Sequence, residues 1–381
     1  MKNSFFYSLI LLLLFVMLKA PAHAQIINGT DTLYGNEWIN FNQSYFKIML
    51  AEDGIYRIPF QALSDAGVPV NSVPGAQFQL FHNGEEIPLH ISNDGTFGTA
   101  DYLEFFGKKN TSELDKHLFK DAEAEMMNPY FSLITDTAAY FLTWTTNLSP
   151  LRYQTIANDM TNLPPKEEYG WYDLTQVFTG GFDKKRNGEG VRNSYFDISE
   201  GYSSGYAQTQ NINITPIQPF IGNQNAMLSL RYACGLGQHN QAIKINGQQA
   251  VADQFNDFQV KSHSLEIANA SLSSQIQVTF EGMASNNDKQ RVAFISLRYP
   301  RLLDAQNQAY FTFSIGASAE EKYLEIAGFN AGTAPVIYDL TNRLRLLPTI
   351  EGNFLKIALP PSNMERQLVL VNQDVAIKTV N

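Results

Sequence analysis

After Gln25, hydrophobic and polar positions alternate over short runs separated by glycine, asparagine and aspartate. Such runs with a period of two, bounded by turn-forming residues, are typical of β-strands. One short helix is expected over Phe60–Ala66, which follows Pro59 and ends before Gly67. The pattern therefore predicts a mainly β protein with several β-sandwich or jelly-roll-like domains in tandem.

Turn dipeptides predict how some of these strands are connected. Asp53-Gly54 separates an alternating run at Ser44–Leu50 from another at Ile55–Ile58, and we expect these two runs to form a hairpin. Asn83-Gly84 and Asn246-Gly247 are also strong signals for tight turns between antiparallel strands, because both positions tolerate a positive φ.

Changes in composition divide the chain into five segments. The boundaries that we expect are a signal peptide at 1–24, an N-terminal β-rich domain at 36–147, an irregular linking segment with a few embedded strands at 148–205, a jelly-roll-like β-sandwich at 206–301 and a small β domain at 302–381.

The first 24 residues have the layout of a secretory signal peptide. Lys2 precedes an apolar run at Phe5–Leu18, and Ala22-His23-Ala24 offers a cleavage site between Ala24 and Gln25. No later stretch is long and apolar enough to predict a transmembrane helix. We therefore expect an exported protein of the periplasm or the cell surface, with no transmembrane segment after cleavage.

Composition and charge exclude several classes of function. The 381 residues carry a formal net charge of −10 without a basic cluster, which argues against a nucleic-acid partner. A single cysteine excludes an internal disulfide framework and a cysteine-rich zinc site. The six histidines lack metal-binding spacing, and no phosphate-binding glycine loop occurs, so no cofactor is expected.

Two groups of residues are candidates for a catalytic or metal-binding role. Cys234, flanked by Ala233 and Gly235, reads as a small buried hydrophobe rather than a nucleophile, so no catalytic residue is assigned. Asp94, Asp101 and Glu104 lie in a glycine-containing stretch and are candidate calcium ligands, but the stretch does not have EF-hand spacing. The alternative is an Asx turn at Asp94 before a strand that begins at Asp101.

Several motifs, taken together and in order, resemble the N-terminal region of the gingipain-like cysteine peptidases of Bacteroidetes, a family that includes the type IX secretion sortases. The opening is carried by Ser44–Ile48 and Glu52–Ile58. The later motifs are Phe78–Gly84, Asp94–Phe97, Asp101–Gly107, Tyr140–Trp144, Leu297–Arg301 and Tyr338–Asn342.

The resemblance implies a β-rich region that precedes a caspase-like peptidase domain. In the family, the nucleophilic cysteine and its histidine belong to that later domain, and no motif of this sequence matches it. We therefore expect a non-catalytic region, truncated before the peptidase domain or existing as a stand-alone copy. The implied partners are the family's own peptidase domain and type IX secretion components at the cell surface.

Two alternatives from other classes stay open. The predicted sandwich at 206–301 suits a carbohydrate- or surface-binding module of an adhesin, since jelly rolls often host such sites. The chain could also be a structural β protein of the periplasm or cell surface without a ligand of its own.

Overall fold

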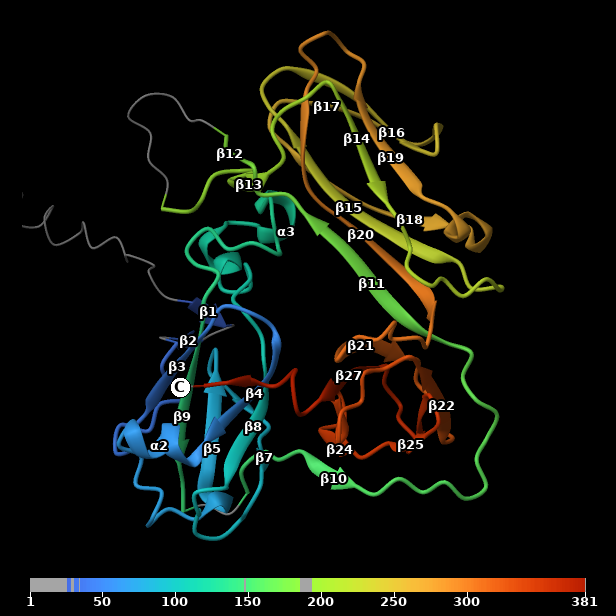
Figure 1. Ribbon diagram of the computed structural model, residues 1–381. Helices are drawn as coiled ribbons and strands as arrows, with labels where there is room; N and C mark the ends of the chain where they lie inside the picture. The colour runs from blue at the N-terminus through green and yellow to red at the C-terminus, as the bar shows by residue number, and fades with distance from the viewer. Residues whose placement is uncertain (1–25, 29–30, 34, 147–148, 186–193, 381) are drawn as a thin grey trace, which may run out of the picture. The chain divides into compact units, whose positions relative to one another are not determined.

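The computed structural model describes residues 26–28, 31–33, 35–146, 149–185 and 194–380 (Figure 1). The expected signal peptide and its cleavage site at Ala24 and Gln25 lie outside these residues. The chain divides into two units, 1–42 and 43–381. In the first unit, β1 (Ile26–Asn28) and β2 (Asp31–Leu33) form an antiparallel pair. No helix in the described part of the chain has the length and apolar character needed to cross a membrane.

The second unit is mainly β, which confirms the predicted fold class. The short helix expected after Pro59 is confirmed as α2 (Phe60–Asp65), and Leu63 is its buried residue. The other helical elements that the structure describes are short: α3 (Ala122–Glu125) and 3-10 turns at Gly75–Gln77, Asp115–Leu118 and Asn269–Ser273.

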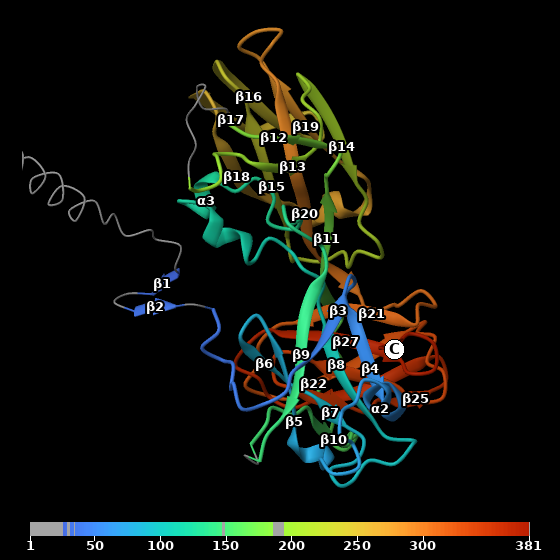
Figure 2. The ribbon, with the colours of Figure 1, turned by 90° about the vertical axis from the view of Figure 1, so that its left-hand side faces the viewer.

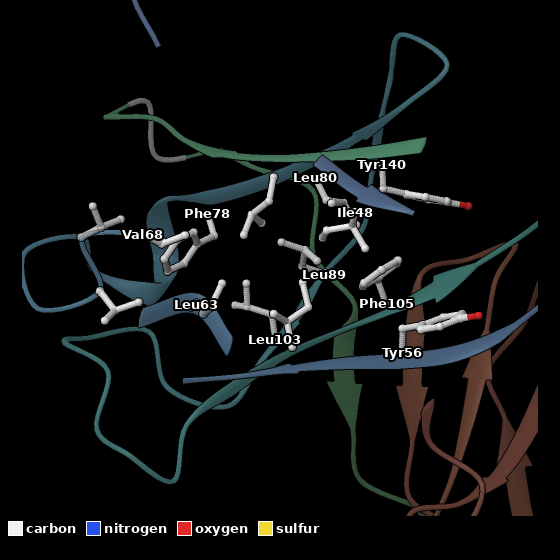
Figure 3. Packing of buried hydrophobic residues seen from close by; sticks show 14 of the residues in the cluster. Ile48, Tyr56, Leu63, Val68, Phe78, Leu80, Leu89, Leu103, Phe105 and Tyr140 are labelled. Carbon is white, nitrogen blue, oxygen red and sulfur yellow. The ribbon is translucent and has the colours of Figure 1, made fainter. Parts of the chain in front are cut away.

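An N-terminal sandwich consists of two four-stranded sheets. The first sheet has the order β3 (Phe46–Leu50), β9 (Ala138–Trp144), β5 (Phe78–His82), β6 (Glu85–Ile87). The second has the order β28 (Lys378–Thr379), β4 (Gly54–Pro59), β8 (Tyr102–Gly107), β7 (His90–Ile91). Alternate side chains of the two sheets meet in one core, where Ile48 and Leu80 lie opposite Phe105 (Figure 3).

The expected hairpin between Ser44–Leu50 and Ile55–Ile58 is wrong. Both runs are strands, but β3 pairs with β9 and β4 pairs with β8, in opposite layers of the sandwich. Alternation reveals which side chains are buried, and both strands bury theirs in the same core, so the pattern cannot tell the two layers apart. Turns at Asn83-Gly84 and Asn246-Gly247 are confirmed, with a positive φ at each residue.

Two further layered parts share one nine-stranded sheet (Figures 1 and 2). Its strand order is β10 (Gln154–Ile156), β24 (Leu344–Leu346), β23 (Pro335–Asp339), β27 (Arg366–Asn372), β21 (Tyr310–Ile315), β11 (Tyr169–Val177), β20 (Gln290–Leu302), β15 (Ala226–Cys234), β18 (Val260–Ile267).

Smaller sheets cover this long sheet and enclose two cores. The half that contains β15 and β20 packs against β14 (Thr209–Ile214), β19 (Ile276–Gly282), β16 (Gln238–Ile245) and β17 (Gln248–Asn256). The half that contains β21 and β27 packs against β22 (Lys322–Ala327), β26 (Phe354–Leu359) and β25 (Thr349–Glu351).

The segment at 148–205, which the sequence suggested to be irregular with embedded strands, supplies part of the long sheet. Its strand β11 pairs with β20 at all nine of its positions, from Tyr169↔Leu302 to Val177↔Phe294. A second pair, β12 (Gly181–Asp183) and β13 (Gly201–Ser203), follows it. The half of the long sheet that contains β15 and β20, together with the sheet β14–β19–β16–β17, forms a central sandwich. The segment at 148–205 joins this central sandwich through backbone pairing.

Candidate functional site

The three candidate calcium ligands occupy different environments. Asp94 lies on an exposed loop, where its carbonyl accepts a hydrogen bond from the Ala76 N–H. Asp101 accepts hydrogen bonds from the Gly98 N–H, the Asn93 amide and the Ser92 hydroxyl, and these lower its pKa. The Asx turn expected at Asp94 is formed instead by Asn93, one residue earlier, whose Oδ1 accepts from the N–H of Gly95 at 2.9 Å.

Glu104 points into the protein interior and is fully buried. Arg57, its cross-strand partner in β4, donates from Nε at 2.8 Å and from Nη2 at 2.5 Å to Oε1. Tyr338 of β23 donates its hydroxyl proton to Oε2 at 2.5 Å. Both oxygens of Glu104 are thus occupied inside the fold, and the structure does not bring this carboxylate together with those of Asp94 and Asp101.

This buried network lies where the N-terminal sandwich meets the long sheet. Burial, and then the charge of Glu104, raises the pKa of Tyr338, so its hydroxyl stays protonated and keeps donating. Around it, the Tyr153 ring packs edge-on against Tyr338 at 4.9 Å between centroids, and Ile55 completes the apolar contact. Strand β28 adds parallel pairing to β4, so the chain returns from the long sheet to the first sandwich.

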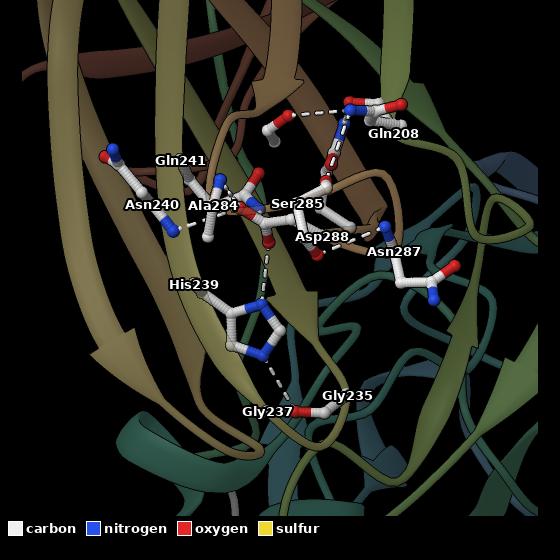
Figure 4. Close-up of polar contacts among 12 residues, drawn as sticks. Gln208, Gly235, Gly237, His239, Asn240, Gln241, Ala284, Ser285, Asn287 and Asp288 are labelled. Carbon is white, nitrogen blue, oxygen red and sulfur yellow. Dashed lines mark hydrogen bonds and ion pairs between the residues drawn. The ribbon is translucent and has the colours of Figure 1, made fainter.

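A second buried cluster surrounds Asp288, which is 1% exposed (Figure 4). Its Oδ1 accepts from His239 Nδ1 at 2.8 Å and from the Gln241 amide at 2.5 Å. Its Oδ2 accepts from the backbone N–H groups of Asn240 at 3.0 Å and Ala284 at 2.9 Å. Burial alone would raise the pKa of Asp288, but these hydrogen bonds outweigh burial and hold the pKa below its ordinary value.

Cys234 lies beside this cluster, so the structure brings together a cysteine, a histidine and an aspartate. The donor atoms of Cys234, His239 and Asp288 lie within 4.8 Å of one another. Cys234 is fully buried, which confirms its assignment as a buried residue, and burial raises the pKa of its thiol far above the ordinary value. Because the thiolate is the nucleophile, this cysteine is held in its unreactive form.

His239 is not available as a base for that thiol. Its Nδ1 is bound to Asp288, and its Nε2 lies 3.0 Å from the carbonyl oxygen of Gly235. A metal ion at the same three residues would have to displace these contacts and those that saturate both oxygens of Asp288. The contacts of His239 and Asp288 stabilise the turn at Gly235 and the loop before β20. They do not supply an activated thiol.

Arg291 is an important residue that the sequence did not reveal. It is 1% exposed and donates to the carbonyl oxygens of Gly201, Asp183 and Ser199 and to the hydroxyl of Ser203. These bonds fasten the pair β12–β13 to β20. Most of its partners are backbone carbonyls, which every residue type carries, so no motif could have indicated them.

Comparison with solved structures supports the fold described above, whereas comparison with family models and curated proteins finds no match. No protein-family model matches the chain, and no curated protein matches it. The structure aligns with dimeric latent PorU from Porphyromonas gingivalis with a TM-score of 0.54 at 12% identity, over 88% of this chain and 32% of that chain. The aligned region therefore spans about a third of the length of the PorU chain.

Carbohydrate-binding modules give weaker alignments. The CBM36-1 domain of a multidomain xylanase from the hindgut metagenome of Trinervitermes trinervoides aligns over 33% of this chain and 96% of its own, with a TM-score of 0.21 at 12% identity. A family 35 module from Clostridium thermocellum aligns over 34% of this chain and 90% of its own, with a TM-score of 0.18 at 13% identity. TM-scores this low do not assign a fold. The conclusion that the chain has a PorU-like fold therefore rests on the alignment with PorU.

Proposed function

We propose that this chain is the non-catalytic, β-rich support region of a gingipain-like cysteine peptidase associated with type IX secretion, which docks a caspase-like peptidase domain. The observation that carries the proposal is the alignment with PorU over 88% of this chain. The order of family-like motifs along the sequence, from Ser44–Ile48 to Tyr338–Asn342, is an independent reason for it.

The buried contacts of the second unit suit a support role. The Arg57–Glu104–Tyr338 network joins the N-terminal sandwich to the long sheet, and β28 returns to β4. A docking region of this kind must hold its layers in one arrangement, so that a peptidase domain meets a preformed surface. In this proposal the chain contributes no nucleophile, because its one thiol is buried and its neighbouring histidine is already engaged.

Export to the periplasm or cell surface is part of the same proposal. The leader pattern at 1–24 supports it, as does the single buried cysteine, which leaves no thiol exposed to an oxidising compartment. Expression of the full chain with its leader in a Bacteroidetes host, followed by N-terminal sequencing of the exported form, tests this point. A mature terminus at Gln25 is expected, and a retained Met1 in the cytoplasmic fraction would refute export.

The support role is tested by mixing the chain with a separately produced peptidase domain of a PorU-class protein from the same source. Size-exclusion chromatography with light scattering should detect a one-to-one complex. A caspase-like domain from an unrelated peptidase is the matched control and should elute separately. Equal behaviour of the two domains would count against the proposal.

One observation favours a carbohydrate- or surface-binding role as the second candidate. An open groove of about 550 Å³ lies on the central sandwich, between the β16–β17 turn and β18. Its lining includes the amide side chains of Asn246, Gln248 and Gln249 together with Glu266. The amides both donate and accept hydrogen bonds and the carboxylate of Glu266 accepts them, as recognition of sugar hydroxyls requires. Reproducible millimolar or tighter binding on a glycan array, reduced by Gln249→Ala, would support this second role.

A further inference from the structure

The nine-stranded sheet is nearly interrupted between β11 and β21. These neighbouring strands share a single residue pair, Trp171↔Ser314. On their other sides both are fully paired, β11 with β20 over nine positions and β21 with β27 over six. The two strands therefore diverge immediately beyond Trp171 and Ser314.

A cavity of about 200 Å³ lies at this point of divergence. Tyr172 and Asp173 of β11 line it, as do Thr312 and Phe313 of β21. In an antiparallel register these are the positions that would pair next after Trp171↔Ser314. The cavity thus borders the stretch where β11 and β21 do not pair and extends to Gln367–Val369 of β27, and Phe106 and Trp171 are the aromatic residues in the rest of its lining.

The edge of β11 stays open beyond the cavity. From Tyr172 to Val177, pairing with β20 occupies one side of the strand, and no described residue forms a backbone hydrogen bond on the other side. An edge of this kind presents N–H and C=O groups in the spacing of a β-ladder and is a template for an added strand. The complementary ligand is the main chain of an extended peptide.

The charges around the cavity indicate what the peptide carries. Asp173 is the acidic residue of the lining, and Arg298 neutralises it at 3.0 Å while also binding Glu365 at 2.7 Å. Lys108 lines the cavity with its ammonium group 5.9 Å from the centre of the Phe106 ring. Asp173 is already paired with Arg298, whereas Lys108 has no ion-pair partner within the described part of the chain, so Lys108 is the lining charge left for an anionic group of a ligand.

We propose that this cavity and the open edge of β11 bind an extended peptide through its main chain and one carboxylate. The carboxylate lies against Lys108 and the hydroxyl of Thr312, and the preceding residues pair with Tyr172–Val177. An apolar side chain of the peptide packs against the aromatic wall at Phe106. The carboxylate comes either from the C-terminus of the peptide or from an acidic side chain. This binding role is independent of the support role proposed above.

Three fluorescein-labelled hexapeptides of alternating threonine and valine distinguish the two sources. The first has a free C-terminus, the second is amidated, and the third is amidated with glutamate at its last position. Fluorescence anisotropy should give at least tenfold tighter binding for the first or the third peptide than for the second, and the tighter one identifies the source. Equal affinity for all three, or binding of none at millimolar concentration, would overturn the proposal.

Lys108→Met tests the site, and Lys109→Met is its control, because Lys109 is the exposed neighbour that does not line the cavity. The first change should weaken the tighter peptide at least fivefold, and the second by less than twofold. Hydrogen exchange supplies a readout that does not depend on charge: bound peptide should slow exchange within Tyr172–Val177. Equal effects of the two variants, or unchanged exchange in β11, would refute binding at this edge.

Discussion

Tyr338 donates a hydrogen bond of 2.5 Å to the buried carboxylate of Glu104, although 234 residues separate the two positions. Glu104 belongs to β8 of the N-terminal sandwich and Tyr338 to β23 of the long sheet. The bond therefore connects two sheets whose strands come from distant parts of the sequence. Arg57 balances the charge of Glu104 from the neighbouring strand. The N-terminal sandwich and the long sheet are therefore held together by a specific hydrogen bond in addition to apolar contacts.

Removal of the Tyr338 hydroxyl should destabilise the protein. Tyr338→Phe leaves one oxygen of a fully buried carboxylate without a donor, and we expect a loss of about 1–3 kcal/mol in the free energy of unfolding. The control is Tyr323→Phe, because Tyr323 donates to Glu325, whose side chain remains partly exposed. Urea denaturation should show at most about half the loss for the control, and equal losses would contradict a special role for the junction.

His90 should make stability depend on pH. Burial, with the nearby charges of Arg345 and Arg57, lowers the pKa of His90 from 6.5 to about 4. The unfolded chain therefore binds a proton below pH 6.5, while the folded chain resists it until about pH 4. The contribution of His90 to stability is greatest above pH 6.5 and falls as the pH drops through this window. The loss in the free energy of unfolding is at most about 3 kcal/mol, and the partial exposure of His90 reduces it.

Urea denaturation between pH 7 and 4 checks this dependence with a matched pair of variants. His90→Gln should reduce the loss of stability across the window, and the part that remains includes the contribution of His82, whose pKa burial also lowers. His117→Gln alters an exposed histidine and should leave the slope of the native protein unchanged. A slope that His90→Gln leaves unchanged would assign the dependence to other groups.

Cys234 should be chemically inert in the folded protein. Its thiol is buried and its pKa is raised, so a thiol reagent such as DTNB should react only in denaturant, at the level of one thiol per chain. Rapid labelling of the native protein would contradict this. Cys234→Ala should also leave any peptide hydrolysis by a purified sample unchanged, and loss of hydrolysis would show that the thiol is catalytic.

Arg291 should be essential for the attachment of β12–β13. Arg291→Met removes the donors for several buried carbonyls, including those of Gly201 and Ser199, and we expect a loss of at least about 3 kcal/mol. Lys289→Met, an exposed change just before the same strand, should cost less than about 0.5 kcal/mol. Limited proteolysis should cleave near residues 194–205 in the first variant only, and resistance there would contradict the assignment.

Local patterns predicted strands and turns but not the partners of the strands. The turns at Asn83-Gly84 and Asn246-Gly247 could be predicted because few residues accept a positive φ at both positions. The hairpin expected at Asp53-Gly54 was wrong because β3 and β4 bury their side chains in one core from opposite layers. The alternation of hydrophobic and polar residues indicates which side chains of a strand are buried, but it does not indicate to which sheet the strand belongs.

The buried polar sites were hidden for a related reason. From its neighbours in the sequence, Glu104 resembles a loop carboxylate. Its burial depends on Arg57, which lies opposite it in β4, and on Tyr338 of a strand distant in sequence. His239 and Asp288 are 49 positions apart, so the spacing of neither residue indicates their contact. Cys234 could be assigned correctly because small and apolar neighbours are themselves a local signal of burial.

The most direct test of the account is the thermal unfolding of a PorU-class peptidase domain from the same source, measured with and without an excess of this chain. If the chain is a support region that binds the folded domain, the midpoint of the domain's unfolding should rise with the concentration of the chain. The chain alone should show no peptide hydrolysis. An unchanged midpoint at saturating concentration, or hydrolysis by the chain that Cys234→Ala abolishes, would contradict the proposed function.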